Sequence, residues 1–485
     1  MTDSKNHLIK INLPGGFASA GDLYEILLIA ENAGASQIRF GNRQQLYFTI
    51  NNDSLEDLET EMLRAEINYE TDNDLYPNIV SSYVADTIFN QEGWLREGVY
   101  KDILDLFDYQ PRLKINLVDN QQTFVPFFSG NINFIAADTN NYWFMYIRFP
   151  KTGKQYCSPY LIYSDDIPLI AKAAERIILD NKHLFYDQDP VNEHLFFKML
   201  FNQTKATIQP VTEALKLPGF YLPYYEGFNK YNNKYWLGIY RRNELFLIDF
   251  LKDVCLLCLK TRVGQLYSTP WKSIIIKGID PVVRNEWGII LSKYHLNVRH
   301  AANELNWQIE DICGEGLELK KELVREFEDA DLRTYQLCFA IKTQPKTGLS
   351  GSIIIKKDKD DLFDILHTQD FNLNSKDYIT YKKCVNRKDL GNQLIDLCHI
   401  YHNSLFNENE FSILDAGNIK ELPKKQDLIY ECKNCKTQYD KDYGDTLNGI
   451  AVGTNFLEIN DNYCCPVCDS GKEDFAPIEK TMVAL

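Results

Sequence analysis

Basic residues are scarce in this 485-residue sequence, where 68 aspartate and glutamate residues outnumber 52 lysine and arginine residues and leave a formal net charge of −16. Affinity for phosphate comes mainly from Lys and Arg, so this balance argues against binding to nucleic acid or to an anionic membrane surface. A redox partner protein with a basic docking face is compatible with it, because complementary charge steers the encounter of two proteins.

Long apolar runs are also missing. The apolar stretch from Leu245 to Leu259 is interrupted by Asp249, Lys252 and Asp253, and it is shorter than the roughly 20 apolar residues that a membrane span needs. The N-terminal residues MTDSKNHLIK contain no apolar core followed by a small-residue cleavage site. We therefore expect a cytoplasmic protein without a membrane span.

Two common catalytic patterns are not found: a specific Gly-rich phosphate loop and an assembled Ser/His/Asp set. Cysteine, by contrast, is plentiful at twelve residues. In a cytoplasmic protein this number suggests metal sites or buried thiols rather than a disulfide framework. The chain is also too long for a single hydrophobic core, so we expect three or more domains.

Residues 11–50 have the pattern strand, helix, strand. A turn is expected at Pro14-Gly15-Gly16, and Ser19-x-x-Asp22 is typical of a helix N-cap. Gly34 is expected to end this helix, and a second strand lies within 37–50.

The same pattern returns about 228 residues later. It predicts a strand at Leu237–Tyr240, a helix that is capped at Asn243 and ends at Gly264, and a returning strand within 265–279. A repeat at this spacing implies duplication of a domain-sized unit rather than a solenoid.

A longer stretch of mixed helix and strand patterns follows each copy. In the first, we expect helices within 94–107 and 166–180 and strands at 111–118, 131–136 and 142–149; in the second, we expect helices at about 317–327 and 389–403 and strands at 335–341 and 351–355. Residues 407–425 are polar and mixed, and we interpret them as a linker to a last domain.

The strongest signal is a pair of C-x-x-C motifs, Cys432-x-x-Cys435 and Cys465-Pro466-Val467-Cys468, separated by 29 residues. Four thiolates in two such knuckles suit a tetrahedral site for zinc or iron. A zinc ribbon usually leaves about 15–20 residues between its knuckles, so this loop is longer than expected for zinc. The loop and its flank also carry a specific string of residues: Tyr439-Asp440, Gly444-Asp445, Gly449-Ile450, Gly453-Thr454-x-Phe456 and Lys472-x-x-Phe475.

These motifs resemble the rubredoxin family over about 50 residues. The resemblance implies a small rubredoxin-like domain at 427–480, one iron ion bound by Cys432, Cys435, Cys465 and Cys468, and single-electron transfer through Fe(III)/Fe(II) cycling. It also implies a small aromatic core, made of Tyr430, Tyr439, Phe456, Tyr463 and Phe475.

Three features depart from the rubredoxin pattern. Lys436 and Asp469 stand where the family usually has a glycine after each knuckle, at positions that favour positive φ. Tyr463 stands in place of the family's tryptophan, and Cys464 is an extra thiol, either a bystander or an alternative ligand.

Residues 427–480 have eleven acidic and five basic side chains, a net charge of −6, which serves either solubility or docking to a basic redox partner.

The duplicated body resembles the sirohaem-containing nitrite and sulfite reductases, on Pro14-Gly15-Gly16, Asn42-Arg43-Gln44, Tyr76-Pro77-Asn78-Ile79-Val80 and Pro111-Arg112-Leu113-Lys114. The resemblance implies two ferredoxin-like half-domains, each followed by an α/β domain. Arg39, Arg43, Arg112 and Lys114 are then candidate contacts for sirohaem carboxylates or an oxyanion, the alternative being solvated surface charges.

Taken together, the two resemblances imply an α+β multidomain chain. Its expected parts are half-domain 1 at 1–70, α/β domain 1 at 71–205, half-domain 2 at 206–285, α/β domain 2 at 286–406, a linker at 407–426 and the rubredoxin-like domain at 427–480.

The reductase family also needs a C-x5-C pair and a C-x3-C pair for its [4Fe–4S] cluster. Between residues 290 and 407 the available cysteines are Cys313, Cys338, Cys384 and Cys398, and none has that spacing. We therefore expect neither this cluster nor sirohaem, and we interpret the body as a catalytically degenerate docking scaffold.

Three functions follow as hypotheses. The preferred one is an electron carrier that serves a reductase, with a possible place in nitrate or nitrite assimilation. The second is an oxidoreductase that binds sirohaem or another tetrapyrrole and is fed by its fused rubredoxin. The third is a zinc-stabilised interaction protein.

Two further cysteine groups have an ordinary interpretation. Cys255-x-x-Cys258 lies in an apolar helical run, where Cys behaves as a small hydrophobe, so core packing is favoured over metal or redox use. Cys398, His399 and His402 lie on a predicted helix, where a buried thiol beside surface histidines is favoured over a metal site.

Overall fold

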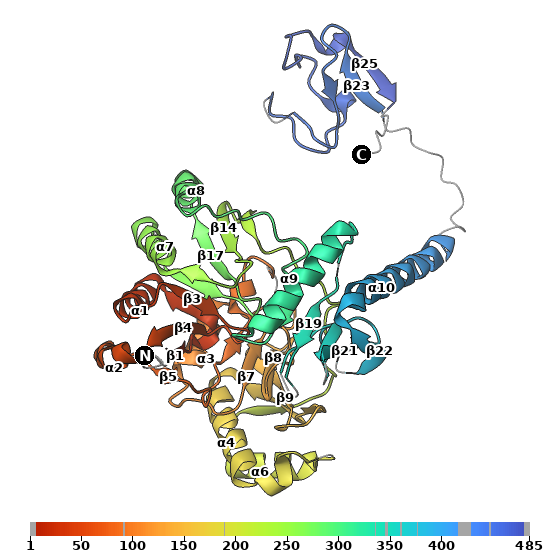
Figure 1. Ribbon diagram of the computed structural model, residues 1–485. Coiled ribbons are helices and arrows are strands. Elements are labelled where there is room, and N and C mark those ends of the chain that lie inside the picture. Colours follow the sequence, from red (N-terminus) through yellow and green to blue (C-terminus); the bar gives the residue numbers. More distant parts are fainter. Residues whose placement is uncertain are drawn as a thin grey trace. The chain divides into compact units, whose positions relative to one another are not determined.

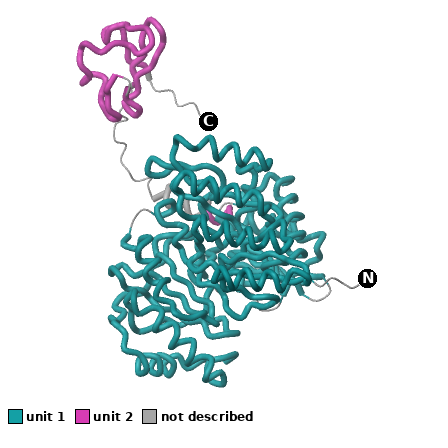
Figure 2. The backbone as a smooth tube through the Cα atoms, turned by 90° about the vertical axis from the view of Figure 1, so that its left-hand side faces the viewer, with its two compact units in different colours: residues 1–401 teal, residues 402–485 magenta. Residues whose placement is uncertain are grey.

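The computed structural model describes residues 6–90, 93–188, 190–334, 336–344, 348–358, 361–375, 377–415, 428–445 and 448–479. The chain divides into two compact units, residues 1–401 and 402–485, which Figure 2 shows in different colours. No helix within the described ranges combines the length and the apolar character that crossing a membrane requires.

The predicted duplication is confirmed by two five-stranded antiparallel sheets of like construction. Their strand orders are β15-β3-β4-β1-β5 and β13-β14-β17-β16-β2. The first copy consists of β1 (Asn6–Ile11), β2 (Phe17–Ser19), α1 (Ala20–Asn32), β3 (Gln37–Phe40), β4 (Leu46–Asn51), α2 (Leu55–Arg64) and β5 (Tyr69–Thr71). The second consists of β13 (Gly227–Tyr231), β14 (Lys234–Ile239), β15 (Phe246–Leu247), α7 (Ile248–Thr261), β16 (Gln265–Ser268), β17 (Ile274–Ile279) and α8 (Arg284–Lys293).

The two half-domains exchange strands. Strand β2 of the first copy pairs with β16 of the second, with Ala18 opposite Leu266, and β15 of the second pairs with β3 of the first, with Phe246 opposite Ile38. Helices α1 and α7 pack side by side over the sheets (Figure 1). Both copies therefore share one hydrophobic core.

Each half-domain is followed by a mixed sheet that begins with three parallel strands and continues antiparallel. The first sheet has the order β12-β11-β9-β8-β7-β6 and the second β18-β19-β20-β21-β22. The first set of elements is β6 (Val80–Ser81), α3 (Glu97–Asp105), β7 (Ile115–Val118), β8 (Ile132–Ala136), β9 (Tyr142–Ile147), β10 (Tyr156–Cys157), β11 (Tyr160–Tyr163), α4 (Ile167–Asp180), α5 (Lys182–Phe185), α6 (Glu193–Gln203) and β12 (Ile208–Pro210). The second set is β18 (Trp307–Ile309), α9 (Gly314–Asp329), β19 (Phe339–Lys342), β20 (Ile353–Lys357), β21 (Leu362–Thr368), β22 (Tyr378–Asn386) and α10 (Arg387–Asp415).

The predicted cap of α1 is confirmed, because the Ser19 hydroxyl accepts a hydrogen bond from the Asp22 N–H at 3.0 Å. The predicted limits of α7 are wrong. Asn243 accepts from the Leu245 N–H instead, and the exchanged strand β15 lies between it and the helix. At the other end, the left-handed residue is Arg262, with φ of +59°, and not Gly264.

The last unit contains a small antiparallel sheet of order β24-β23-β25, formed by β23 (Leu428–Cys432), β24 (Gln438–Tyr439) and β25 (Phe475–Glu479). Helix α10 runs through Asp415, so the first part of the predicted linker is helical. The rest of that linker lies outside the described residues.

The β3–β4 and β16–β17 hairpin turns meet a buried network of charged groups. Asp311 accepts hydrogen bonds from the backbone and side chain of Asn42 at 2.9 Å and from Gln45 at 3.2 Å. The Lys272 ammonium lies 3.7 Å from Asp311 and 2.9 Å from the Glu244 carboxylate, and both Lys272 and Glu244 are almost completely buried. Asn42 and Gln45 of one hairpin turn and Lys272 of the other thus bind the same carboxylate.

We predict that Lys272→Met destabilises the body by about 3–5 kcal/mol, because it leaves the carboxylates of Glu244 and Asp311 buried without their cation. The matched control is Lys260→Met, which breaks the exposed pair with Glu286 and should change stability by no more than about 0.5 kcal/mol. Urea unfolding followed by tryptophan fluorescence measures both. Equal effects of the two substitutions would contradict the prediction.

Candidate functional site

The four predicted ligands meet at one point of the last unit. The Sγ atoms of Cys432, Cys435, Cys465 and Cys468 all lie within 4.8 Å of one another. The sulfur atoms of Cys432 and Cys468 are 3.7 Å apart, and those of Cys435 and Cys465 are 3.4 Å apart. Four convergent sulfurs suit a tetrahedral metal site for iron or zinc.

The two knuckles have the same backbone construction. The N–H of Lys436 donates to the Cys432 carbonyl at 2.9 Å, and the N–H of Asp469 donates to the Cys465 carbonyl at 3.0 Å. Lys436 and Asp469 are left-handed, with φ of +65° and +56°, as expected for positions where a glycine is usual. The knuckle geometry therefore forms although neither residue is a glycine.

Hydrogen bonds favour the thiolate form of two ligands. Backbone N–H groups, first that of Cys435, lower the pKa of Cys432, and the hydroxyl of Thr437 is the main cause that lowers the pKa of Cys435. At Cys468 the hydrogen bonds from Ser470 also favour the thiolate, but the neighbouring cysteines outweigh them and raise its pKa to about 11. Because thiolates this close repel one another, only a cation can hold all four in the ionised form.

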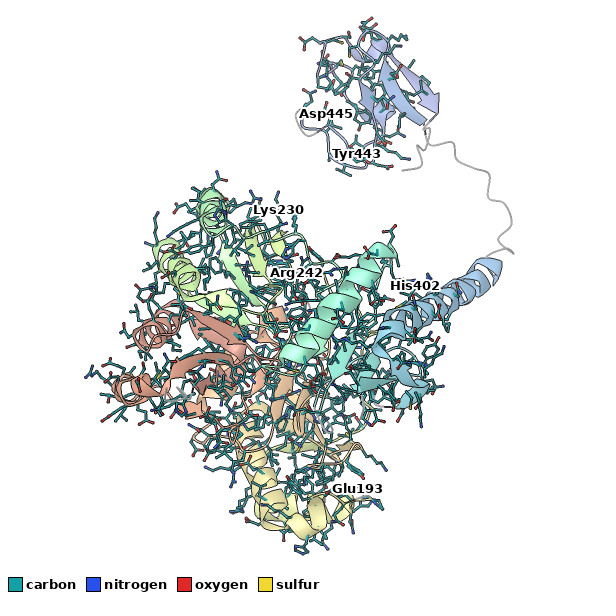
Figure 3. All side chains as sticks on the ribbon, viewed as in Figure 1. Glu193, Lys230, Arg242, His402, Tyr443 and Asp445 are labelled. Carbon is teal, nitrogen blue, oxygen red and sulfur yellow. The ribbon has the colours of Figure 1, made fainter. Side chains whose placement is uncertain are left out.

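A small aromatic core supports the site, as predicted. The rings of Tyr430 and Phe456 stack at 4.2 Å, and Phe475 and Tyr463 contact the same Phe456 ring. Tyr439 completes the cluster and packs with the buried ligands Cys432 and Cys465. The Tyr463 hydroxyl donates to Asp445, which Figure 3 labels, at 2.9 Å. The tyrosine that replaces a tryptophan thus binds the loop between the knuckles.

The other cysteines do not join a site of this kind. Cys464 is exposed, and its thiol lies 3.6 Å from the Asn462 carbonyl, outside the ligand group. Burial raises the pKa of Cys255 to about 12, as expected for a packed thiol, and it does the same for Cys398, whose neighbour His399 is exposed. Within the described ranges, no second group of three or more Cys, His, Asp or Glu side chains brings its ligand atoms this close.

In the body, Arg43 is a buried charged residue. It lies in the β3–β4 turn, and its guanidinium donates to the carbonyls of Asn78 at 2.7 Å and Ile115 at 2.9 Å and to the Asn116 side chain at 3.3 Å. Burial is the main cause that lowers its pKa to about 9. The donors of Arg43 are thus used by the protein, and its positive charge is not matched by a bonded carboxylate among the described residues.

A basic cavity of about 620 Å³ lies near this residue. Arg112 and Lys114 line it, together with Arg148, Lys151 and Lys182, and its one acidic lining residue, Asp74, is paired with Lys10. Burial, followed by the positive charge of Arg43, lowers the pKa of Lys114 to about 8. Within the described part of the chain, neither Lys114 nor Arg148 has a carboxylate partner.

Two of the four predicted body residues, Arg112 and Lys114, thus line one cavity, whereas Arg43 is buried near Lys114 and is not among the lining residues. Arg39 lines a different cavity, beside Tyr47 and Ile312. Sequence reasoning did not identify Arg148, Lys151 and Lys182, because none of them belongs to a recognisable motif. Arg148 and Lys151 lie in the loop after β9, and Lys182 is the first residue of the short helix α5. The only signal was their positive charge in an acidic protein.

Comparison with known proteins identifies the last unit. Residues 429–475 match the rubredoxin family. The chain is 39% identical over 49 residues to rubredoxin-2 of Chlorobaculum tepidum, covering 94% of that protein and 10% of this chain. It is 41% identical over 63 residues (13% of this chain) to the high molecular weight rubredoxin of Moorella thermoacetica and 40% identical over 53 residues (11%) to rubredoxin-2 of Ectopseudomonas oleovorans. It spans only 28% and 31% of the lengths of these two proteins.

The fold of the body has a counterpart among solved structures. The Mycobacterium tuberculosis NirA protein superposes with a TM-score of 0.60 and 14% sequence identity, over 80% of this chain and 80% of that chain. This likeness concerns the fold alone, and it confirms the predicted α+β multidomain body, which has the fold of the NirA protein.

The left-handed conformation of Lys436 should reduce the stability of the domain. Lys436→Gly removes a side chain from a position where a non-glycine residue is strained by about 1–2 kcal/mol, partly offset by the greater freedom of glycine in the unfolded chain. We expect a net gain of about 0.5 kcal/mol, measured as a higher denaturant midpoint for loss of the thiolate-to-metal absorption. Lys433→Gly, at a knuckle position without positive φ, is the control and should not stabilise.

Proposed function

The chain belongs to the rubredoxin family through its C-terminal domain, and we propose that this domain carries single electrons to or from a reductase on one iron ion. The observation that carries the proposal is the convergence of Cys432, Cys435, Cys465 and Cys468 inside a domain that matches the family. Sulfur geometry alone suits both iron and zinc, and the family match favours iron.

The iron would supply one-electron Fe(III)/Fe(II) chemistry, and the protein holds its ligands in place. Cys432 and Cys465 are buried against the aromatic core, so one side of the site is closed to water. Cys468 is exposed, and the neighbouring Val467 has 70% of its surface accessible. Electrons would enter and leave on this open side, where a partner can approach a ligand closely.

Charge and fold support the choice of partner. The net charge of −6 at 427–480 favours a redox protein with a basic docking face. The fused body has the fold of the NirA protein, which favours a reductase system, and nitrate or nitrite assimilation is the process that we propose. In this proposal the body is a docking scaffold rather than a catalyst.

We predict a visible absorption spectrum of iron–thiolate type that bleaches with dithionite, with about one iron per chain. Cys432→Ala removes a buried ligand and should lower the iron content at least about tenfold. Cys464→Ala removes the adjacent exposed thiol and should leave spectrum and iron unchanged. A colourless chain with one zinc after expression in iron-rich medium would instead support the zinc-stabilised interaction protein.

We propose a second function for the body, binding of a ligand with clustered oxyanion groups in the basic cavity. The favouring observation is that the half-buried side chains of Lys114 and Arg148 line this cavity without a bonded carboxylate among the described residues, next to the charge of Arg43. Clustered cations that are partly removed from water are unfavourable, and an anion would offset that unfavourable energy.

Two kinds of ligand carry such groups: a tetrapyrrole with carboxylate groups, such as sirohaem, and a small inorganic oxyanion. The donor set fits either, because Arg112, Lys114 and Arg148 are hydrogen-bond donors that can pair with carboxylates. Arg43 would contribute its charge but few free donors, since its guanidinium is already bonded to carbonyls.

We predict that phosphate, nitrite or sulfite binds the body, and that Lys114→Met or Arg148→Met weakens the binding by about tenfold or more. Affinity should fall as the pH rises through about 8, because Lys114 then loses its charge. Lys172→Met, which breaks an exposed pair with Asp108, is the control. Isothermal titration calorimetry measures the oxyanions, and a Soret band after expression in a sirohaem-producing host would identify the tetrapyrrole. Equal affinity of all variants would contradict this proposal.

A further inference from the structure

A hydroxyl group lies against each of the two outer cysteine ligands. Thr437 Oγ1 is 3.0 Å from Cys435 Sγ, and Ser470 Oγ is 3.0 Å from Cys468 Sγ. Both residues occupy the second position after the last cysteine of a knuckle, directly behind the left-handed residue. The two knuckles therefore present the same side-chain contact to the metal site.

The direction of these hydrogen bonds follows from the chemistry of the ligands. A cysteine that binds a metal is a thiolate without a proton, so the hydroxyl has to be the donor. At Ser470 a further contact orients the hydroxyl, because Asn434 Nδ2 donates to Ser470 Oγ at 2.8 Å. Ser470 accepts from Asn434 of the other knuckle and keeps its own proton for Cys468.

We propose that Thr437 and Ser470 raise the reduction potential of the iron, and that Asn434 acts as a positioning residue for Ser470. The inference rests on the proposed electron-carrier function. One iron with four thiolates has a net charge of −1 as Fe(III) and −2 as Fe(II). Donors aimed at the sulfurs stabilise the more negative state more strongly, so they favour reduction.

The hydroxyls act at the two ligands that solvent reaches more easily. Cys432 and Cys465 lie in the domain interior, whereas Cys435 and Cys468 are the more accessible member of each knuckle. Water molecules can donate hydrogen bonds to an exposed sulfur, but they exchange with the solvent. A hydroxyl held 3.0 Å from the sulfur instead donates a hydrogen bond whose direction stays the same. The hydroxyls would thus stabilise negative charge on the two sulfurs that a partner can reach.

The test is potentiometric titration of the iron-loaded full-length chain, followed by its visible absorption. Thr437→Val keeps the shape of the side chain and removes the hydroxyl, and Ser470→Ala removes the other. We expect each to lower the ratio of Fe(II) to Fe(III) at a fixed ambient potential about threefold. Together they should lower it about tenfold, which for one electron is about 59 mV. Thr437→Ser keeps a hydroxyl at this position and should have the same reduction potential as the parent chain.

Thr454→Val is the matched control, because the Thr454 hydroxyl donates to the Ala451 carbonyl in the same domain and not to a sulfur. Its potential should equal that of the parent chain. Asn434→Ala should lower the potential by less than Ser470→Ala does, and it should add nothing when Ser470 is already alanine. Only a positioning role predicts this dependence.

The outcomes separate the two proposals. Unchanged potentials in Thr437→Val and Ser470→Ala, with the iron spectrum intact, would overturn this inference and leave the electron carrier in place. A parent chain without reducible iron would overturn both. If Thr437→Val or Ser470→Ala loses iron, Asn434→Ala still tests Ser470 with both hydroxyls present, because an unchanged potential there would contradict the positioning role.

Discussion

The reciprocal exchange of strands between the two half-domains is the constraint on which the rest of the body depends. Strand β2 completes the sheet of the second copy, and β15 completes the sheet of the first, so neither sheet is whole without the other. The exchange brings both hairpin turns to the middle of the molecule. Gln44 in one turn donates to the carbonyl of Ser268 near the other and to that of Ser81 in the adjacent α/β sheet. Backbone pairing thus sets the position of Arg43.

The same arrangement explains why the centre of the body is positively charged. Arg43 projects from a turn whose place is determined by strand pairing, and Lys114 and Arg148 come from the ends of strands in the neighbouring sheet. Clustering of like charges is unfavourable, and a bound anion would offset that unfavourable energy. The body has the fold of the NirA protein, its cysteines between residues 290 and 407 lack the spacing expected for the cluster, and the basic cavity is where we propose that an anion binds.

The iron domain depends on short-range structure instead. Its ligands lie in two knuckles whose hydrogen bonds join residues only a few positions apart, and the aromatic core contacts the buried sulfurs directly. Lys436 and Asp469 adopt the left-handed conformation because the turn requires it, whatever the side chain. The contact of Asn434 with Ser470 joins the knuckles through side chains, and it gives the site a feature beyond the backbone pattern of its family.

The ligands of the iron site could be predicted from the sequence alone, because all four cysteines and their packing residues belong to a local pattern whose spacing specifies the geometry. It also determined the duplication, since hydrophobic periodicity and caps such as Ser19 are local. The positions and contacts of the basic residues in the body, by contrast, can be seen only in the tertiary structure. Arg39 and Arg43 lie four positions apart, yet one lines a separate cavity and the other is bonded at the centre. Arg148 and Lys182 join Lys114 through contacts between distant segments, and such long-range contacts have no periodic signal in the chain.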